Sequence, residues 1–142
     1  MILLDANLLI YAYHADTPQH GAATAWLEQV IGANEPVGVT WPSIWAFLRV
    51  STNPKLWPKP MTATVAAEAM RKLLAQPSVI FVEPGPRHLR ILEEVLTQSQ
   101  ALGPLVSDAV LAAIAIEHGA TLASTDQDFS RFEKLRWINP LR

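Results

Sequence analysis

Residues 107–124 read SDAVLAAIAIEHGATLAS, and this stretch decides the fold class. The apolar run over residues 109–116 predicts a helix that is buried on all sides. It is much shorter than the roughly 20 residues that a helix needs to cross a bilayer. Gly119 is typical of the residue just past a helix end, and residues 121–124 then predict a strand. A buried helix joined directly to a strand is typical of a layered α/β protein.

Similar units repeat along the rest of the chain. Short apolar runs predict further strands at residues 2–4, 37–40 and 79–82, with a candidate fifth strand at residues 137–138. Apolar residues at helical spacing predict helices over residues 8–13, 41–50, 65–74 and 89–96, and one that begins at Thr17 and Pro18. This alternation predicts an α/β sandwich on a mainly parallel sheet of four to five strands, with residues 1–142 as a single domain.

The composition excludes several classes of protein. Half of the 142 residues are hydrophobic and 17% are charged, which excludes a disordered chain. The absence of cysteine excludes a disulfide scaffold, a thiolate zinc site and a cysteine nucleophile. The formal net charge of −2 excludes a large basic surface, so any binding of nucleic acid requires local basic patches. The first residues lack the basic segment of a secretory signal, and we expect a cytoplasmic protein without membrane association.

Four of the five aspartates lie where predicted strands and helices meet. Asp5 follows the first strand, and Asp126 and Asp128 follow the strand at residues 121–124. Asp108 lies at the start of the buried helix. The carboxyl ends of parallel strands meet at one edge of a sheet, and sites form there in such folds. We therefore expect these four carboxylates to gather at one edge.

Gathered carboxylates repel one another, and they stay ionised together only when a cation neutralises them. Sites made of oxygen ligands alone suit Mg²⁺ or Mn²⁺, which activate water and hold phosphate oxygens. The pattern therefore predicts a metal-dependent phosphodiesterase. Each aspartate taken alone has a second interpretation, because Asp5 and Asp108 also suit helix caps and the pair Asp126 and Asp128 suits an ordinary turn.

Three segments together resemble the PIN domain, and specifically the VapC-type ribonuclease toxins. Residues 3–10 (LLDANLLI) resemble the family's opening strand and its Asp-x-Asn turn. Residues 106–113 (VSDAVLAA) resemble the helix that carries the third acid, and residues 117–129 (EHGATLASTDQDF) resemble the closing strand and acidic turn. The motifs occur in order and cover essentially the whole chain. The resemblance implies a three-layer α/β/α fold.

The resemblance also implies a function and a site. It implies a metal-dependent endoribonuclease toxin of a type II toxin–antitoxin system, which hydrolyses RNA by metal-activated water. Asp5, Asp108 and Asp126 match its ligands of Mg²⁺ or Mn²⁺, and Asp128 matches a second acid near the metal. Asn7 matches the residue that steadies the first acid, and Ser124 a hydroxyl that supports the pocket. The implied partners are a VapB-like antitoxin, an RNA substrate such as transfer or ribosomal RNA, and a second copy in a homodimer.

One position departs from the family pattern. The family usually carries a glutamate in the helix after the second strand, where this chain has Ala46. The missing carboxylate favours one metal ion over two. It also leaves open a catalytically degenerate module that binds RNA or a protein partner without cutting. A haloacid-dehalogenase-like phosphotransferase is disfavoured, because residues 5–9 (DANLL) lack the second Asp and the Thr that it needs.

Contacts to RNA would have to come from a few basic residues. Arg49 is the basic residue that we expect nearest to the acids. Lys55, Trp57 and Lys59 form a proline-rich loop that suits phosphate binding and base stacking, although Trp57 equally suits a subunit interface. The tryptophans at 41 and 45 fit the apolar spacing of their helix, which predicts a core or interface position.

Overall fold

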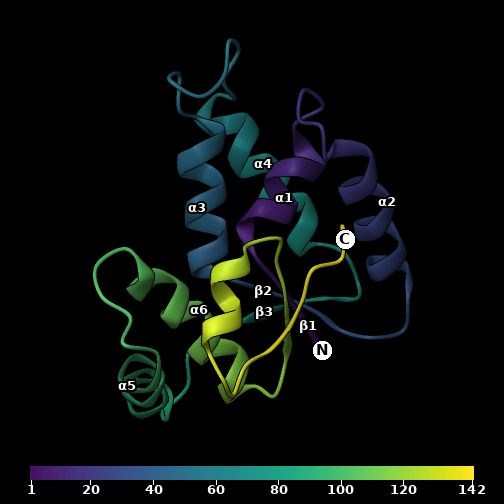
Figure 1. Cartoon of the computed structure of the whole chain (residues 1–142). Coiled ribbons are helices and arrows are strands. Elements are labelled where there is room, and N and C mark those ends of the chain that lie inside the picture. Colours follow the sequence, from purple (N-terminus) through teal and green to yellow (C-terminus); the bar gives the residue numbers. More distant parts are fainter.

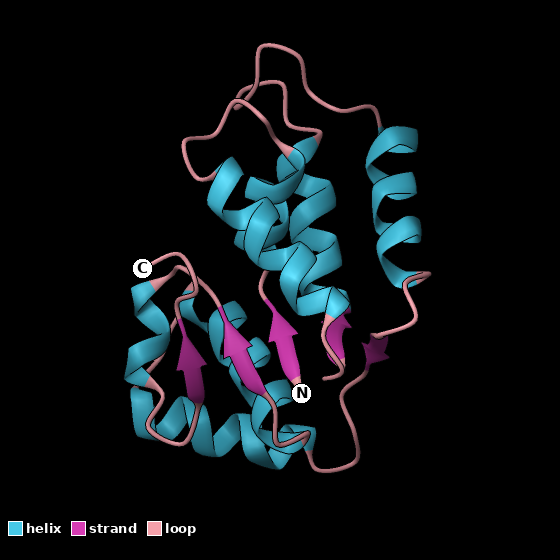
Figure 2. Ribbon diagram, turned by 90° about the vertical axis from the view of Figure 1, so that its right-hand side faces the viewer, coloured by secondary structure: helices cyan, strands magenta, loops and turns pink.

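Five strands form one sheet in the computed structural model, which describes residues 1–142. They are β1 (Ile2–Leu4), β2 (Val37–Thr40), β3 (Val79–Val82), β4 (Thr121–Ala123) and β5 (Arg136–Ile138). Their order across the sheet is β3-β2-β1-β4-β5, and every neighbouring pair is parallel (Figure 2). The sheet confirms the prediction of a mainly parallel arrangement, and residues 136–138 form the fifth strand.

Six α-helices and one short 3-10 helix connect the strands (Figure 1). The helices are α1 (Ala6–Tyr13), α2 (His20–Gly32), α3 (Trp41–Ser51), α4 (Ala63–Leu74), α5 (His88–Ser99), α6 (Leu105–Glu117) and the 3-10 helix η1 (Gln127–Arg131). None of them has the length and apolar character needed to span a bilayer.

The hydrophobic core is divided in two by the sheet. Leu4 packs with residues of α1 to α4 on one face, whereas Leu3 packs with residues of α5 and α6 on the other. Successive strand residues point to opposite faces, so these two neighbours serve different cores. Helices on both faces of the sheet confirm the three-layer α/β/α fold.

Helix α6 is the most deeply buried of the helices, as its sequence predicts. Its buried residues include Ala109, Ala112, Ala113 and Ala115, whose small side chains allow the helix to lie close to its neighbours. Gly119 follows the helix with a φ of +63°, a backbone conformation that favours glycine. The helix begins at Leu105, slightly before the predicted start, and Asp108 lies in its first turn.

The predicted start of the second helix at Thr17 and Pro18 is wrong. Helix α2 begins at His20 instead. The hydroxyl of Thr17 donates a hydrogen bond of 2.8 Å to the carbonyl of His14. A hydroxyl that bonds backward in this way closes the turn after α1, and no side chain caps the start of α2.

The strand order places a topological switch point between β1 and β4. From β1 the chain adds β2 and β3 on one side, and it then returns to add β4 and β5 on the other side. Open parallel sheets bind ligands at such a point, outside the carboxyl ends of the strands. The residues at this point are Asp5 after β1 and residues 124–128 after β4.

Candidate metal centre

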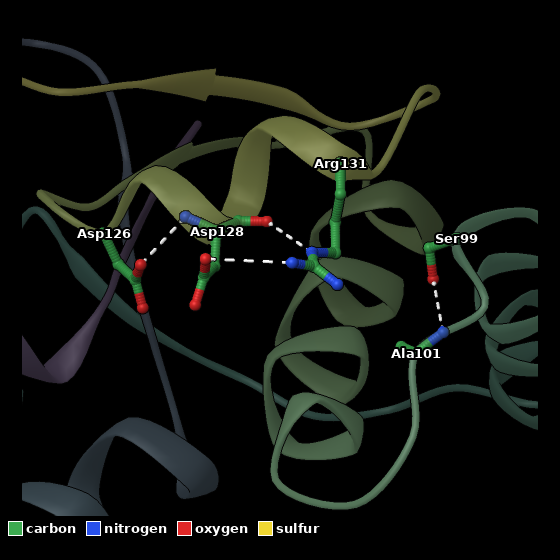
Figure 3. Close-up of polar contacts among 5 residues, drawn as sticks. All are labelled: Ser99, Ala101, Asp126, Asp128 and Arg131. Carbon is green, nitrogen blue, oxygen red and sulfur yellow. Dashed lines mark hydrogen bonds and ion pairs between the residues drawn. The ribbon is translucent and has the colours of Figure 1, made fainter.

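Three aspartates converge beside the switch point. One carboxylate oxygen from each of Asp108, Asp126 and Asp128 lies within 4.8 Å of the other two. Asp108 comes from the first turn of α6, and the other two come from the start of η1. Figure 3 shows the carboxylates of Asp126 and Asp128 on the same side of η1. The structure therefore brings together three of the four aspartates that the sequence singles out.

Local hydrogen bonds fix the positions of Asp126 and Asp128. The carboxylate of Asp126 accepts a 2.9 Å hydrogen bond from the backbone N–H of Asp128 and so caps η1. Arg131, one turn later, lies 3.8 Å from the Asp128 carboxylate and donates to the Asp128 carbonyl at 3.3 Å (Figure 3). The sequence interpretation missed Arg131, although its spacing of three residues from Asp128 in a helical turn is the signal for such a pair.

Ser124 connects the segment after β1 to the segment after β4. Its fully buried hydroxyl donates a 2.6 Å hydrogen bond to Asp5. The same oxygen accepts hydrogen bonds from the side-chain amide of Asn7 at 3.2 Å and from the backbone N–H of Asp126 at 3.0 Å. Asn7 and Ser124 are thus placed where they hold Asp5 and Asp126 in register. The Oδ1 atom of Asn7 is buried and has no hydrogen-bond partner in the chain.

Asp5 lies beside the three-aspartate cluster and outside its 4.8 Å limit. One of its carboxylate oxygens accepts a 2.7 Å hydrogen bond from the N–H of Ala6, which caps α1, and the other accepts from Ser124. Asp5 and Asp108 line a common cavity of about 360 Å³ at the carboxyl edge of the sheet. Asp108 thus belongs both to the three-aspartate cluster and to the wall of this cavity, where Asp5 joins it.

The carboxylates act on one another electrostatically. Burial and the charges of Asp126, Asp5 and Asp128 raise the pKa of Asp108 from 3.8 to about 6, against the opposing charge of Arg131. Burial also raises the pKa of Asp5, and the charge of Asp126 adds to this effect. Such a group of oxygen donors with crowded negative charge fits a hard divalent cation such as Mg²⁺ or Mn²⁺.

Helix α3 supplies one wall of the cavity and no carboxylate. Ala46, the position where a glutamate is usual, lines the cavity with Arg49. Arg49 thus shares a cavity with Asp5 and Asp108. The expectation that it is the basic residue nearest to the acids is wrong, because Arg131 lies 3.8 Å from the Asp128 carboxylate and Arg49 forms no ion pair. Glu117 does not replace the missing acid, because its carboxylate accepts hydrogen bonds from the N–H groups of Gly85 and Arg87 at 2.7 and 3.0 Å.

The basic loop after α3 lies away from the acids. Lys55, Trp57 and Lys59 follow the end of α3 that points away from the sheet, and none of them lines the cavity (Figure 1). The ring of Trp57 stacks on His14 with centroids 4.0 Å apart, and its indole N–H donates to the carbonyl of Val50 at 2.8 Å. One face of Trp57 is therefore occupied within the chain, whereas both lysines are exposed.

The apolar spacing predicts a core or interface position for Trp41 and Trp45, and the structure excludes the core position. Both are exposed, because α3 buries the face that carries Ile44 and Phe47 instead. Apolar spacing alone does not distinguish these two faces of the helix.

Comparisons with known proteins agree with this architecture. A family model described as "PIN domain" matches residues 2–135. Ribonuclease VapC33 of Mycobacterium tuberculosis is 38% identical over 142 residues, which cover 100% of this chain and 99% of that protein. Ribonuclease VapC37 of the same species is 39% identical over 140 residues, covering 99% and 97% of the two chains.

Solved structures show the same fold at lower sequence identity. The VapBC2 complex from Rickettsia felis, bound to a promoter DNA fragment, matches with a TM-score of 0.73 and 19% identity over 98% of each chain. VapC20 of M. tuberculosis, described as a sarcin-ricin loop cleaving toxin, matches with a TM-score of 0.70 and 16% identity over 96% of this chain and 99% of that one. The family match and the full-length relatives establish that this chain belongs to the PIN-domain family, among the VapC proteins.

Proposed function

We propose that this chain is a metal-dependent endoribonuclease that hydrolyses phosphodiester bonds in RNA. The observation that carries the proposal is the convergence of Asp108, Asp126 and Asp128 at the switch point, with Asp5 beside Asp108 on the wall of one cavity. The names of its full-length relatives, which are ribonucleases, support the same activity. The fold alone would not support this activity, since one fold hosts many functions.

Asp5, Asp108 and Asp126 would hold one Mg²⁺ or Mn²⁺ ion, with Asp128 near it. When bound, the ion supplies an activated water and neutralises charge on the phosphate. The chain's own residues would keep the ligands in place: Ser124 donates to Asp5 and accepts from Asn7, and Arg131 pairs with Asp128. Absence of a carboxylate at Ala46 favours a single ion.

The positive charges near the cavity would bind the RNA backbone. Arg49 lines the cavity and is the group placed to bind a phosphate next to the reacting one. Lys55 and Lys59, beyond the far end of α3, would bind phosphates further along the strand. Trp57 would then act by holding this loop against His14.

The same proposal includes the cellular role. We infer that the chain is a toxin of a type II toxin–antitoxin system, acts in the cytoplasm on transfer or ribosomal RNA, and forms a homodimer. A VapB-like antitoxin would restrain it by covering the acidic cavity. Support comes from the VapC relatives and from structural neighbours that are toxin–antitoxin complexes.

The test is cleavage of total cellular RNA by the purified, antitoxin-free protein with Mg²⁺ or Mn²⁺. The wild type should cut, and EDTA should stop it. Asp5→Asn should lose most of the activity, because it removes a ligand charge without changing shape. Asp16→Asn is the matched control, since it removes the charge of an exposed aspartate outside the cavity and should cut like the wild type. A folded wild type that leaves several classes of RNA intact would contradict the proposal.

Ala46 supports one competing function, a degenerate module that binds RNA or a protein without cutting. Such a module would show negligible Mn²⁺ binding by titration calorimetry. Retention of the three-aspartate cluster, with Asp108 and Asp5 lining one cavity, favours the nuclease.

A further inference from the structure

Helix α3 presents a stripe of aromatic and basic side chains to solvent. Trp41, Trp45 and Arg49 are each four residues apart, so they lie on one face of the helix. The exposed fraction is 42% for Trp41 and 59% for Trp45, and Arg49 is exposed as well. Large aromatic side chains that are grouped on a surface indicate a binding site.

The aromatic rings of this stripe support one another. Trp41 and Trp45 are stacked, with ring centroids 5.9 Å apart and an interplanar angle of 21°. Phe81 of β3 packs edge-on against Trp41, at 5.1 Å and 74°. We call these three residues the aromatic platform. Trp41 thus lies between Phe81 and Trp45, and it supports the ring of Trp45, most of whose surface stays open to solvent.

The aromatic platform continues directly into the acidic cavity. Trp45 lines that cavity together with Arg49, Asp5 and Asp108. Arg49 also lines a second cavity of about 400 Å³, where α3 faces the start of α4. The two cavities thus both adjoin α3 and share Arg49. The first of them also holds the ring of Trp45 and the carboxylates of Asp5 and Asp108.

This sequence of groups matches the chemistry of a single nucleic-acid strand. An unpaired base offers a π-face that stacks on an aromatic ring, and the phosphate beside it binds an arginine. Bases inside a duplex are stacked on each other and cannot offer that face. A protein partner could also use the rings as apolar area, and the test below distinguishes the two occupants.

We propose that Trp45 stacks on an unpaired base of the RNA next to the scissile phosphate, with Trp41 and Phe81 as its support and Arg49 on the adjoining phosphate. This inference rests on the proposed ribonuclease function, and it adds to it a binding position for one base beside the acidic cavity. Trp45 is a positioning residue here, since it touches substrate away from the reacting atoms.

The first test measures binding of a fluorescein-labelled, unstructured RNA oligonucleotide in Mg²⁺, using Asp5→Asn as a background that does not cut. Trp45→Leu keeps exposed apolar area and removes the π-face, so affinity should fall about 10-fold. Trp45→Phe should restore most of it. Leu89→Ala, at an exposed apolar residue outside both cavities, should bind like the background protein. The same RNA as a duplex should bind more weakly than the single strand.

Two outcomes would contradict the proposal that the aromatic platform binds a base. One is equal RNA affinity for Trp45→Leu and the background protein. The other is loss of self-association in Trp45→Leu by sedimentation with RNA affinity unchanged, which would assign the platform to contact between copies of the chain. Trp45 is exposed, so misfolding of the variant is not expected, and circular dichroism checks this.

Cleavage kinetics in the otherwise wild-type protein separate this inference from the proposed function. Trp45→Leu should raise KM about 10-fold with kcat changed little, because stacking acts before and during the reaction alike. If the wild type cuts RNA and Trp45→Leu has the same KM, base stacking on Trp45 is contradicted and the ribonuclease activity is supported. If the wild type never cuts, yet RNA binding depends on Trp45, the ribonuclease activity is contradicted and base stacking on Trp45 is supported.

Discussion

The hydroxyl of Ser124 makes three hydrogen bonds, one to each of Asp5, Asn7 and the N–H of Asp126. A hydroxyl has one donor and two acceptor positions, so all of its capacity is used. Two of the partners are proposed ligands that come from strands far apart in the sequence. The relative position of these two carboxylates therefore depends on one buried oxygen atom.

Ser124→Ala should weaken Mn²⁺ binding by about 10- to 100-fold, the usual effect of losing a group that orients metal ligands. It should also lower the free energy of unfolding by about 1–3 kcal/mol, because buried polar partners are left unpaired. Titration calorimetry and urea denaturation measure the two effects. Ser130→Ala, at an exposed serine of η1, is the control and should change neither. Wild-type Mn²⁺ affinity in Ser124→Ala would contradict the role given to this hydroxyl.

The charge of Asp108 should destabilise the metal-free protein at neutral pH. Its pKa is about 6 in the folded chain against 3.8 for the free group, so the folded state binds the extra proton between these values. Stability should therefore fall as pH rises from about 4 to about 6.

Asp108→Asn should accordingly stabilise the metal-free protein by about 1 kcal/mol near pH 8, a value reduced for solvent screening at a partly exposed group. The gain should largely disappear near pH 3, which lies below both pKa values, so that the wild-type carboxyl is mostly protonated in the folded and the unfolded state. Urea denaturation in EDTA at the two pH values measures this. An equal gain at both values would mean that charge repulsion is not its cause.

At the scale of elements, the end of α6 matters because this helix carries Asp108 into the site. Gly119 terminates the helix with a positive φ, and no atom lies within 4 Å of the position that a Cβ would occupy. Gly119→Ala should therefore lower stability by about 1 kcal/mol through backbone strain alone. Gly32→Ala, at a glycine with equally open surroundings and no positive φ, should be neutral or slightly stabilising. Equal effects of the two substitutions in urea denaturation would show that strain at Gly119 is absent.

The strands and most helices could be predicted from the sequence because their buried faces require apolar residues at regular spacing or in short runs. The apolar run of α6 and the short runs of β1 to β4 are of this kind. The start of α2 could not be predicted, because Thr17 has two possible partners for its hydroxyl and only the folded chain shows that it bonds to His14.

The site was predictable to a similar extent. Asp5, Asp108, Asp126 and Asp128 stand at strand ends or a helix start, and parallel topology alone brings such positions together. The side-chain network around them was not predictable from spacing. The stack of Trp57 on His14 and the exposure of Trp45 depend on which helix faces pack together, which is a property of the tertiary structure.

At the scale of the whole molecule, a metal ion at the switch point would join two halves of the sheet. The proposed ligands that follow β1 and β4 come from opposite ends of the chain. Helix α6, which carries Asp108, directly precedes β4. Unfolding would separate all of them, so binding of the ion would be coupled to global stability.

Mn²⁺ at about 100 times its dissociation constant should therefore stabilise the wild type by about 2.7 kcal/mol and raise its Tm by about 5–10 °C. Asp126→Asn should show little of this response, whereas Asp16→Asn should respond like the wild type. A Tm that is insensitive to Mn²⁺ in the wild type, or equally sensitive in Asp126→Asn, would argue against an ion at this place.

The most direct measurement is titration calorimetry of Mn²⁺ into the purified, metal-free chain, with Asp108→Asn titrated beside it. The predicted result is saturable binding with one ion per wild-type chain and a large loss of affinity in the variant. Negligible heat in the wild type, or equal binding by both proteins, would contradict a metal centre formed by these aspartates.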